Sequence, residues 1–481
     1  MKIALINIPD NGISGKGYSA PLGLAYIASV IRNLNHDVFV YDLSVSKESI
    51  KKYYLQVDHD FLGRITSLAP DIIGMTCSTT NRFNVAFWAN LFKKNLPNVK
   101  IVVGGPHPFF IVEEYLAENK DVDFLVLGEG ERAIADLINC LQHGSDYEAV
   151  KGIAYRKDGT IIVNELAEII SNLDEIPFPS RDLFPMMEYD ISFGSINKGK
   201  AATIITSRGC GNTCKFCSTT CYWTKLRYRT AKNIVDEIEL ILGHYPDIRD
   251  IIFFDDTFTA NRKHAVAVCT EIFNRQLKFN WACWSRTNIL DKEFFEMLKE
   301  SGCTTLAYGI ESGNDEMLKV IKKNSTVAKN HFALSEGRKY GICTRGTMIG
   351  GMPEEKLEWA LDSIFFIAKA RIPLDDLRIN FRTFIFPGTY WEKWFREKYP
   401  DFTWSKIPPR FKEGAFVDDF GNVTLPCYQW KGFPYFMIRS LYSLMLRYSL
   451  FIHLLRFSLV QSFLRAVVRI AKITYPKSVF D

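Results

Sequence analysis

Short apolar runs rich in β-branched residues alternate with longer helical patterns through the first part of the chain. Such runs are typical of buried parallel strands, and apolar positions three and four residues apart are typical of helices that cover a sheet. The expected strands are KIALINI, DVFVYDL, DIIGMTC, KIVVGG and DFLVLGE. The segments between them include LGLAYIASVIRNL, VAFWANLFKKNL and GERAIADLINCL. The alternation predicts an α/β domain with a doubly wound parallel sheet over residues 1–145.

Residues 146–198 interrupt this alternation, and their pattern predicts a hairpin followed by a linker. GIAYRKDGTIIVNE contains two short strand patterns around Asp158 and Gly159, a pair that favours a tight β-turn. The following LDEIPFPSRDLFP contains three prolines, which preclude a long helix. We therefore expect this stretch to connect two domains.

A second alternation of strands and helices covers residues 199–390. Its expected strands are AATIITS, DIIFFDD, FNWACWS, TTLAYGIE, ICTRGTMIG and LRINFRTFIF, each followed by a helical or loop segment. Six such units are fewer than the eight of a closed (β/α)8 barrel. The pattern predicts an open, partial (β/α)6 barrel of the TIM type.

Residues 391–481 change character again and predict a small aromatic cap followed by basic amphipathic helices. Basic residues are spread over an otherwise apolar tail, at Arg439, Arg447, Arg456, Arg465, Arg469 and Lys472. Their angular spacing does not fit one straight amphipathic helix, so we expect two or three shorter ones. Such helices either lie on an anionic membrane surface or pack on the barrel, and peripheral membrane contact is the favoured interpretation.

Composition narrows the class of protein. The 481 residues are 47% hydrophobic and 23% charged, which predicts a chain that folds throughout and into several domains. A net charge of +5 is too small for this length to indicate nucleic acid, and no such partner is expected. The N-terminal MKIALINIPD does not resemble a signal peptide, so we expect a cytoplasmic protein, membrane-associated at the inner face through its tail. Its eleven cysteines are then thiols or metal ligands.

Three of these cysteines form a C-x3-C-x2-C motif on the loop after the first strand of the second alternation. Cys210, Cys214 and Cys217 can bind three irons of a [4Fe–4S] cluster and leave the fourth iron open to a ligand. Zinc is an alternative, with Cys221 as a fourth ligand, although structural zinc sites usually draw their ligands from two separate knuckles. Three unrelated buried thiols are the remaining alternative.

The motif resembles that of the radical S-adenosylmethionine (SAM) superfamily, C-x3-C-x-aromatic-C, with Phe216 at the aromatic place. The resemblance implies that the open iron chelates SAM, whose reductive cleavage yields a 5′-deoxyadenosyl radical. FFDDTF, WSRTN, YGIESG and MIGGMPEE resemble segments that line the SAM pocket in this superfamily. By that resemblance Asp256, Arg286, Glu311 and Ser312 are candidates for binding SAM. Alternatively, Arg286 pairs with Asp255 or Asp256, and Glu311 caps a turn.

Small residues mark the carboxyl ends of the strands expected in the first domain, where ligands of doubly wound sheets bind. A large ligand can approach the backbone there, although each glycine taken alone can equally serve a tight turn. The candidate residues are Thr76, Ser78, Gly104, Gly105, Gly128, Glu129 and Gly130.

A domain of this kind before a radical SAM barrel resembles the cobalamin-binding class, which includes the class B radical SAM methyltransferases. The resemblance covers residues 1–390 and implies a Rossmann-like domain that binds cobalamin. The D-x-H-x-x-G loop that supplies a lower-axial histidine in methionine synthase is absent, so cobalamin is expected without a histidine ligand. His107 is interpreted as a turn residue.

The resemblance implies methyl transfer from methylcobalamin to an unactivated carbon. The apolar, basic C-terminal tail is similar to those of enzymes that act on tetrapyrroles, hopanoids and other lipids. A hydrophobic small molecule is therefore the expected substrate. The cluster implies an electron donor such as flavodoxin or ferredoxin. Two alternatives remain: a radical SAM cyclase, dehydratase or ring-rearranging enzyme without methyl transfer, and a metal- or cobalamin-binding sensor.

Overall fold

The computed structural model describes most of the chain, and its N-terminal domain is built on a seven-stranded sheet. The described residues are 1–10, 19–193, 196–223, 225–370, 376–380, 382–405, 407, 416–417, 423–428, 437–438, 440–441, 443–444, 455–456 and 458–474. The first five strands of the sheet are β1 (Lys2–Asn7), β2 (Asp37–Asp42), β3 (Ile72–Thr76), β4 (Lys100–Gly104) and β5 (Phe124–Val126). They lie parallel in the order β2-β1-β3-β4-β5, which confirms the predicted doubly wound arrangement.

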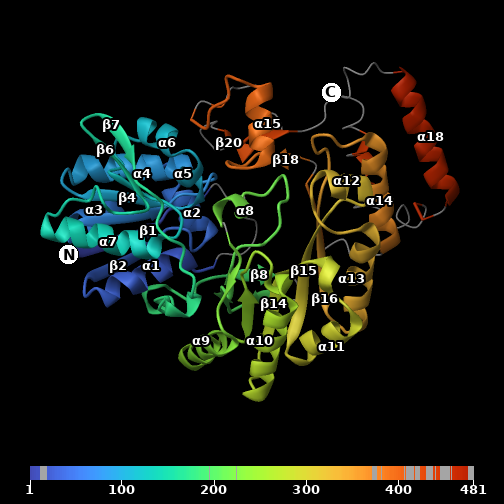
Figure 1. Ribbon diagram of the computed structural model, residues 1–481, viewed down its shortest axis with the longest axis horizontal. Coiled ribbons are helices and arrows are strands. Elements are labelled where there is room, and N and C mark those ends of the chain that lie inside the picture. The colour runs from blue at the N-terminus through green and yellow to red at the C-terminus, as the bar shows by residue number, and fades with distance from the viewer. Residues whose placement is uncertain are drawn as a thin grey trace.

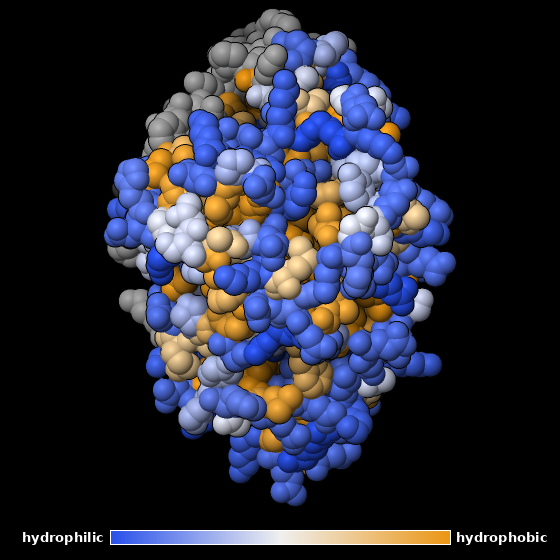
Figure 2. All heavy atoms as spheres, turned by 90° about the vertical axis from the view of Figure 1, so that its left-hand side faces the viewer, coloured by the Kyte–Doolittle hydropathy of each residue, from blue (hydrophilic) through white to orange (hydrophobic). Residues whose placement is uncertain are grey.

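Side chains of β1 alternate between two hydrophobic cores, one on each face of this sheet. Ile3 and Leu5 pack in the core that contains α1 (Leu22–Asn33) and α7 (Gly130–His143). Ala4 and Ile6 pack in the other core, with α3 (His59–Leu68) and α4 (Arg82–Asn95). This period of two explains why the strands of a sheet covered on both faces are apolar throughout. In Figure 2 hydrophilic side chains surround the apolar ones on the outer face of this domain.

Three short helices and a hairpin complete the domain. The helices α2 (Lys47–Tyr53), α5 (Pro106–Phe110) and α6 (Val112–Glu118) were not among the helical segments named from the sequence, and neither was α3. The hairpin, β6 (Ile153–Lys157) and β7 (Thr160–Val163), turns at Asp158 and Gly159, which both have positive φ angles. It does not belong to the linker, because β6 pairs antiparallel with β5 and extends the sheet. The sheet is therefore mixed at this edge, and the connecting segment is shorter than expected.

The segment after the hairpin is not a free linker, because it packs between the two domains. It contains η1 (Leu173–Glu175), η2 (Arg181–Leu183) and the two-stranded sheet β8 (Ile191–Phe193) and β9 (Ile196–Gly199). Arg181 forms a buried ion pair with Glu237 at 2.5 Å, and Arg229 pairs with the other oxygen of the same carboxylate. Arg181 also donates to the Thr203 carbonyl, at 2.7 Å. These contacts join the segment to the first strand and first helix of the second domain.

The second domain is the predicted partial barrel of six parallel strands. The strands follow one another in chain order as β10 (Ala201–Ile204), β13 (Asp250–Phe253), β14 (Asn280–Ser285), β15 (Cys303–Glu311), β16 (Cys343–Ile349) and β17 (Leu377–Asn380). The outer helices are α9 (Ala231–His244), α10 (Arg262–Asn274), α11 (Lys292–Glu300), α12 (Asp315–Val320), α13 (Val327–Lys339) and α14 (Leu357–Ala370). Figure 1 shows this barrel in green and yellow beside the blue and cyan N-terminal domain.

Small elements connect and cap these strands. Short strands and one short helix flank the cysteine loop, namely β11 (Ser207–Arg208), α8 (Thr219–Tyr222) and β12 (Arg227–Tyr228). Two 3-10 turns follow strand ends, η3 (Phe258–Ala260) and η4 (Thr287–Ile289). The aromatic cap contains α15 (Tyr390–Lys398), β18 (Thr383–Phe384), β19 (Phe416–Val417), β20 (Val423–Leu425) and β21 (Cys427–Tyr428).

The C-terminal helix α18 (Ser458–Thr474) packs on the barrel through one face. Arg465 forms an ion pair with Asp362 of α14 at 2.6 Å, and Arg456 donates to the Ala368 carbonyl at 2.8 Å. Leu459 and Phe463 point outward, with 83% and 67% of their surfaces exposed. In the described ranges no helix has both the length and the apolar character needed to cross a membrane. Two basic residues of the predicted tail, Arg439 and Arg447, lie outside the described residues.

We predict that Glu237→Gln destabilises the protein by about 3–5 kcal/mol, because it leaves two buried guanidinium groups without their counter-charge. The matched control on the same helix is Glu239→Gln, whose partially exposed carboxylate pairs with Arg275 and should contribute less than about 1 kcal/mol. Urea unfolding of both variants measures the difference. Equal stabilities of the two variants would contradict the structural role given to Glu237.

Candidate active site

The cysteine loop, residues 209–218, leaves β11 through a conformation that needs glycine. Gly209 has φ +98°, and a Cβ atom there would lie 2.8 Å from the Lys225 carbonyl oxygen. Further along, the N–H of Cys217 donates to the Cys214 carbonyl at 3.1 Å and closes a tight turn. All three cysteines of the motif lie on this loop and are half-buried.

Neighbouring polar groups contact these thiols, including Thr219 at Cys217. The Sγ of Cys210 lies 3.5 Å from Oγ1 of Thr257 and accepts from Nδ2 of Asn212, also at 3.5 Å. The Sγ of Cys214 lies 3.7 Å from the Lys322 carbonyl oxygen.

The donor set fits an iron–sulfur cluster better than a single zinc ion. Cys210, Cys214 and Cys217 are half-buried, whereas Cys221 is exposed on α8. Within the described part of the chain, no three His, Cys, Asp or Glu side chains converge closely enough to bind one metal ion. A [4Fe–4S] cluster is larger than a single ion and takes thiolates at the corners of a wider body. Three thiols from one loop are therefore the residues that would hold such a cluster and leave one iron open.

Phe216, the aromatic residue of the motif, packs behind the loop. Its ring lies 6.0 Å from that of Trp391 in the aromatic cap, and the ammonium group of Lys323 lies 5.9 Å from its centre. The backbone of Lys215 donates to Ile321 at 3.1 Å. Through Phe216 and the backbone of Lys215 the cysteine loop thus contacts both the aromatic cap and the barrel.

The two neighbouring aspartates after β13 have different surroundings. Asp255 is buried and accepts from the backbone of Thr206 at 2.6 Å, from the hydroxyl of Thr206 at 2.5 Å and from the backbone of Ser207 at 2.9 Å. It therefore orients the segment that leads into the cysteine loop. Asp256 accepts from the Thr219 hydroxyl at 3.2 Å and lines a cavity. Of the pair, Asp256 is the one that can reach a ligand.

The other candidates for SAM already have partners within the protein. Arg286 donates to the Lys323 carbonyl. Among the described residues it forms no ion pair with Asp255 or Asp256. Glu311, at φ +62°, forms a buried ion pair with Lys323 at 2.9 Å. Their role toward SAM stays a prediction.

Ser312 was expected to bind SAM, but its position in the structure does not favour that role. It is fully buried, and its hydroxyl lies 3.2 Å from that of Ser363 and accepts from the backbone of Asn314. The hydroxyl stabilises the turn after β15. This burial could not be seen in the sequence, because it depends on α14 packing over the turn.

One cavity of about 480 Å³ lies at the carboxyl ends of the N-terminal strands, and we call it the sheet cavity. It brings together the predicted Thr76, Gly104, Gly105, Gly128, Glu129 and Gly130. Leu5, Leu24 and Val102 form apolar walls. Gly105 has φ +107°, and a Cβ atom there would lie 2.6 Å from the Cys77 carbonyl oxygen, so only glycine allows this backbone path. A roomy, mostly apolar cavity walled by bare backbone fits a large planar cofactor such as cobalamin.

Buried ion pairs join this cavity to the cysteine loop. Arg208, two residues before Cys210, pairs with Glu129 at 2.9 Å and with Glu131. Arg227 pairs with Glu129 at 2.8 Å. Burial alone would raise the pKa of Glu129, but Arg227 and Arg208 lower it below its ordinary value. The sequence pattern contains no signal for these partners, because they come from different domains.

His107 cannot serve as an axial ligand in this arrangement. It is 1% exposed, its Nδ1 lies 3.2 Å from the Thr79 hydroxyl, and its ring packs edge-on against Trp404. Burial lowers the pKa of His107 well below its ordinary value, so the ring is neutral. It belongs to α5 and does not line the sheet cavity.

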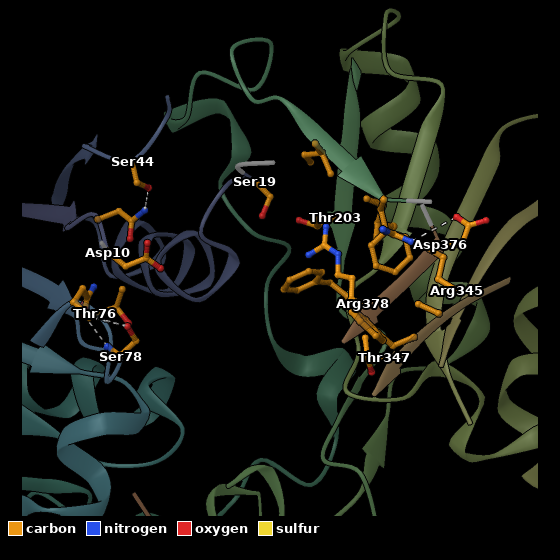
Figure 3. Close-up of a pocket in the computed structure, with 18 of the residues that line it drawn as sticks. Asp10, Ser19, Ser44, Thr76, Ser78, Thr203, Arg345, Thr347, Asp376 and Arg378 are labelled. Carbon is orange, nitrogen blue, oxygen red and sulfur yellow. Dashed lines mark hydrogen bonds and ion pairs between the residues drawn. The ribbon is translucent and has the colours of Figure 1, made fainter. Parts of the chain in front are cut away.

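A second cavity of about 480 Å³ opens between the N-terminal domain and the inside of the barrel, and we call it the barrel cavity. Phe254 and Thr76 line both cavities, so the two spaces meet at these residues. Ser78, predicted as a cofactor residue, faces the barrel cavity. Figure 3 shows the polar groups of the two walls, with Asp10, Ser44, Thr76 and Ser78 on one side and Arg345, Thr347, Asp376 and Arg378 on the other.

Comparison with known proteins agrees with this geometry. Residues 10–138 match the B12 binding domain and residues 204–367 match the Radical SAM superfamily. The chain is 32% identical to an uncharacterized methyltransferase of Pyrococcus horikoshii, over 77% of this chain and 78% of that protein. It is 28% identical to an anaerobic magnesium-protoporphyrin IX monomethyl ester cyclase of Rubrivivax gelatinosus, over 73% of this chain and 62% of that protein.

A solved structure shares the fold. The radical SAM methyltransferase TsrM from Kitasatospora setae, with cobalamin and a [4Fe–4S] cluster bound, superposes with a TM-score of 0.67 at 18% identity. The match covers 89% of this chain and 84% of that one.

A cobalamin-type sheet domain followed by a partial barrel with the C-x3-C-x2-C loop defines a radical SAM enzyme. The chain belongs to the family of cobalamin-binding radical SAM enzymes, which contains methyltransferases and cyclases. Its cofactors are accordingly a [4Fe–4S] cluster, SAM and cobalamin.

Cys214→Ala should remove the iron–sulfur cluster and the reductive cleavage of SAM together, because three thiolates are needed to hold the cluster. Cys221→Ala is the matched control, since Cys221 is exposed outside the motif and should retain both. Iron content and 5′-deoxyadenosine formation under anaerobic, reducing conditions measure the two properties. Cleavage retained in Cys214→Ala would contradict the assignment of the cluster.

Glu355, in the MIGGMPEE segment after β16, makes stability depend on pH. Its carboxylate accepts from the backbone of Gly351 at 2.7 Å and of Met352 at 3.0 Å. Burial nevertheless raises the pKa of Glu355 to about 8 from an ordinary 4.5. The folded chain therefore holds this proton more tightly than the unfolded chain does. The contribution to stability is greatest below pH 4.5 and is lost as the pH rises toward 8.

We predict that Glu355→Gln, which keeps an oxygen to accept the two N–H groups but does not titrate, removes this dependence. The Tm of the wild type minus that of the variant should fall by several degrees between about pH 5 and pH 8. Thermal unfolding at each pH tests this, and a constant difference would contradict it.

Proposed function

We propose that this enzyme transfers a methyl group from SAM, through cobalamin, to an unactivated carbon of a hydrophobic small molecule bound in the barrel cavity. The observation that carries the proposal is the meeting of two cavities. Phe254 and Thr76 line the sheet cavity, which fits cobalamin, and also the barrel cavity. A substrate in the barrel cavity would therefore lie next to the cofactor that donates the methyl group.

When bound, SAM and the cluster supply a radical that removes hydrogen from carbon, and cobalamin supplies the methyl group. The residues of the chain bind and orient. Apolar side chains line much of the barrel cavity, at Ile191, Phe193, Ile252, Phe254, Trp284 and Ala307. They can hold an apolar substrate and keep water from a reactive centre. No general base is required for a carbon-centred step, which agrees with the absence of a catalytic triad motif in the sequence.

The relatives support radical SAM chemistry in general, and they include both a methyltransferase and a cyclase. The Pyrococcus relative is named as a methyltransferase, and the Rubrivivax relative as a cyclase that acts on a tetrapyrrole. A radical SAM cyclisation without methyl transfer is therefore the second candidate. The fate of the SAM methyl group separates the two.

We also propose two partners. The cluster needs an external electron, and a flavodoxin or ferredoxin would supply it to the half-buried loop of Cys214 and Cys217. The exposed Leu459 and Phe463 of α18 support peripheral contact with a lipid surface. Both partners would place the enzyme in the cytoplasm, at the inner face of the membrane.

The test follows a labelled methyl group and needs no substrate. In the anaerobically reconstituted protein we expect SAM with a deuterated methyl group to label the extracted cobalamin. Formation of 5′-deoxyadenosine with unlabelled cobalamin would overturn methyl transfer and favour the cyclase. Zinc in place of iron, with no cleavage of SAM, would favour a sensor.

Gly23→Leu should selectively abolish cobalamin binding. Gly23 lies on α1, lines the sheet cavity and has open space where a side chain would be added. Leucine there would fill the cavity, so bound cobalamin and methyl labelling should fall at least about tenfold while iron content and SAM cleavage persist. Gly63→Leu is the matched control, because Gly63 is also an exposed helical glycine with open space but lies on α3. Normal cobalamin content in Gly23→Leu would contradict the assignment of the cavity.

A further inference from the structure

Two arginines project from neighbouring strands into the barrel cavity, whose barrel side also carries apolar residues such as Ile252 and Trp284. Along β16 the side chains alternate, with Thr344 and Met348 buried toward the helices and Arg345 and Thr347 facing the cavity. On β17, Arg378 faces the cavity and stands in register with Thr347. Inward positions of such barrels are usually occupied by branched apolar residues. Two arginines there need a reason other than packing.

The cavity lining contains two aspartates, and of these Asp376 lies on the same wall as the arginines. Asp376 lies 4.0 Å from Arg345, and it also accepts from the Cys343 thiol at 3.4 Å. No ion pair joins Arg378 to an acid among the residues that the structure describes. Asp10 is on the opposite wall, which the N-terminal domain forms, as Figure 3 shows. Among the described residues that line the cavity, the barrel wall therefore carries two cations and one carboxylate.

Holding these two cations close together costs free energy, because their charges repel each other. Burial and the neighbouring Arg378 lower the pKa of Arg345, while Asp376 only partly opposes them. Arg345 also lies against the ring of Phe193, at 5.9 Å, rather than in water. An anion between the guanidinium groups would relieve their repulsion and replace lost hydration.

The anion is not the carboxylate of SAM. SAM must bind at the cluster, and neither the three cysteines nor Arg286, Glu311 or Ser312 is among the residues that line the barrel cavity. The cobalamin site is also separate, because the sheet cavity includes neither Arg345 nor Arg378. The remaining molecule that enters the barrel cavity is the substrate.

We propose that Arg345 and Arg378 bind an anionic group of the substrate, a carboxylate or a phosphate, and thereby define the substrate as an amphipathic acid. This inference rests on the proposed function in taking the barrel cavity as the substrate site. Guanidinium groups bind both kinds of oxyanion through paired N–H donors. With the head group held at β16 and β17, the apolar body would extend along Trp284 toward Phe254, where the two cavities meet. The reacting carbon would then lie away from the charged end.

The test measures binding of small probes to the holoenzyme by calorimetry. The probes are 4-phenylbutyrate, phenyl phosphate and the uncharged 4-phenylbutanol. We expect the anions to bind at least about tenfold more tightly than the alcohol, and the tighter anion identifies the head group as carboxylate or phosphate. Arg345→Gln and Arg378→Gln should each weaken anion binding about tenfold and leave the alcohol unaffected.

Arg249→Gln is the matched control, because Arg249 is exposed before β13, outside the barrel cavity. Arg345→Lys and Arg378→Lys keep the charge and guard against misfolding, and they should retain part of the affinity. Iron content and bound cobalamin should stay at wild-type levels in all variants, because neither arginine lines the sheet cavity or belongs to the cysteine loop.

Equal affinity for anions and alcohol would overturn the inference, as would anion binding unchanged in the double Gln variant. Absence of saturable binding by either anion up to about 10 mM would also overturn it. The proposed function fails separately. If the wild type binds the anions through these arginines but never labels its cobalamin, methyl transfer is wrong and the anion site stands.

Discussion

The site depends on the buried ion pairs between the N-terminal domain and β11 and β12, the two strands that flank the cysteine loop. Arg208 and Arg227 of the barrel meet Glu129 and Glu131 where the N-terminal strands end. All four side chains are less than a tenth exposed, so removing one partner would strand a charge away from water. The pairs therefore fix the loop that carries the cluster relative to the cavity that fits cobalamin.

Because these ion pairs fix the two domains relative to each other, the sheet cavity and the barrel cavity lie side by side. Each lies where strands of one domain end against the other domain, and Phe254 and Thr76 form part of both walls. Chemistry that uses two cofactors in sequence needs such a shared boundary, because the substrate must reach both without leaving the protein. The connecting segment adds a second fixed point through Arg181 and Glu237, so the domains are joined on more than one side.

The C-terminal part of the chain combines two roles that looked like alternatives in the sequence. Arg465 and Arg456 fix the tail to α14 and the barrel, as a packed helical cap would require. The helix α18, which carries Arg465, leaves Leu459 and Phe463 exposed on its outer side. Arg465 on the barrel side and two apolar side chains on the outer side are compatible with packing on the barrel and with contact to a lipid surface.

Local pattern alone was enough to determine the parallel strands of both domains and the cluster motif. Strands such as β1 and β16 follow from side-chain period, and Cys210, Cys214 and Cys217 follow from spacing along one loop, because both depend on near neighbours in the chain. Only the tertiary structure decided that the hairpin extends the first sheet and that Ser312 is buried. It alone paired Arg208 with Glu129 and turned Arg345 and Arg378 toward one cavity. Those outcomes depend on which distant surfaces meet, and a pattern of near neighbours carries no information about such contacts.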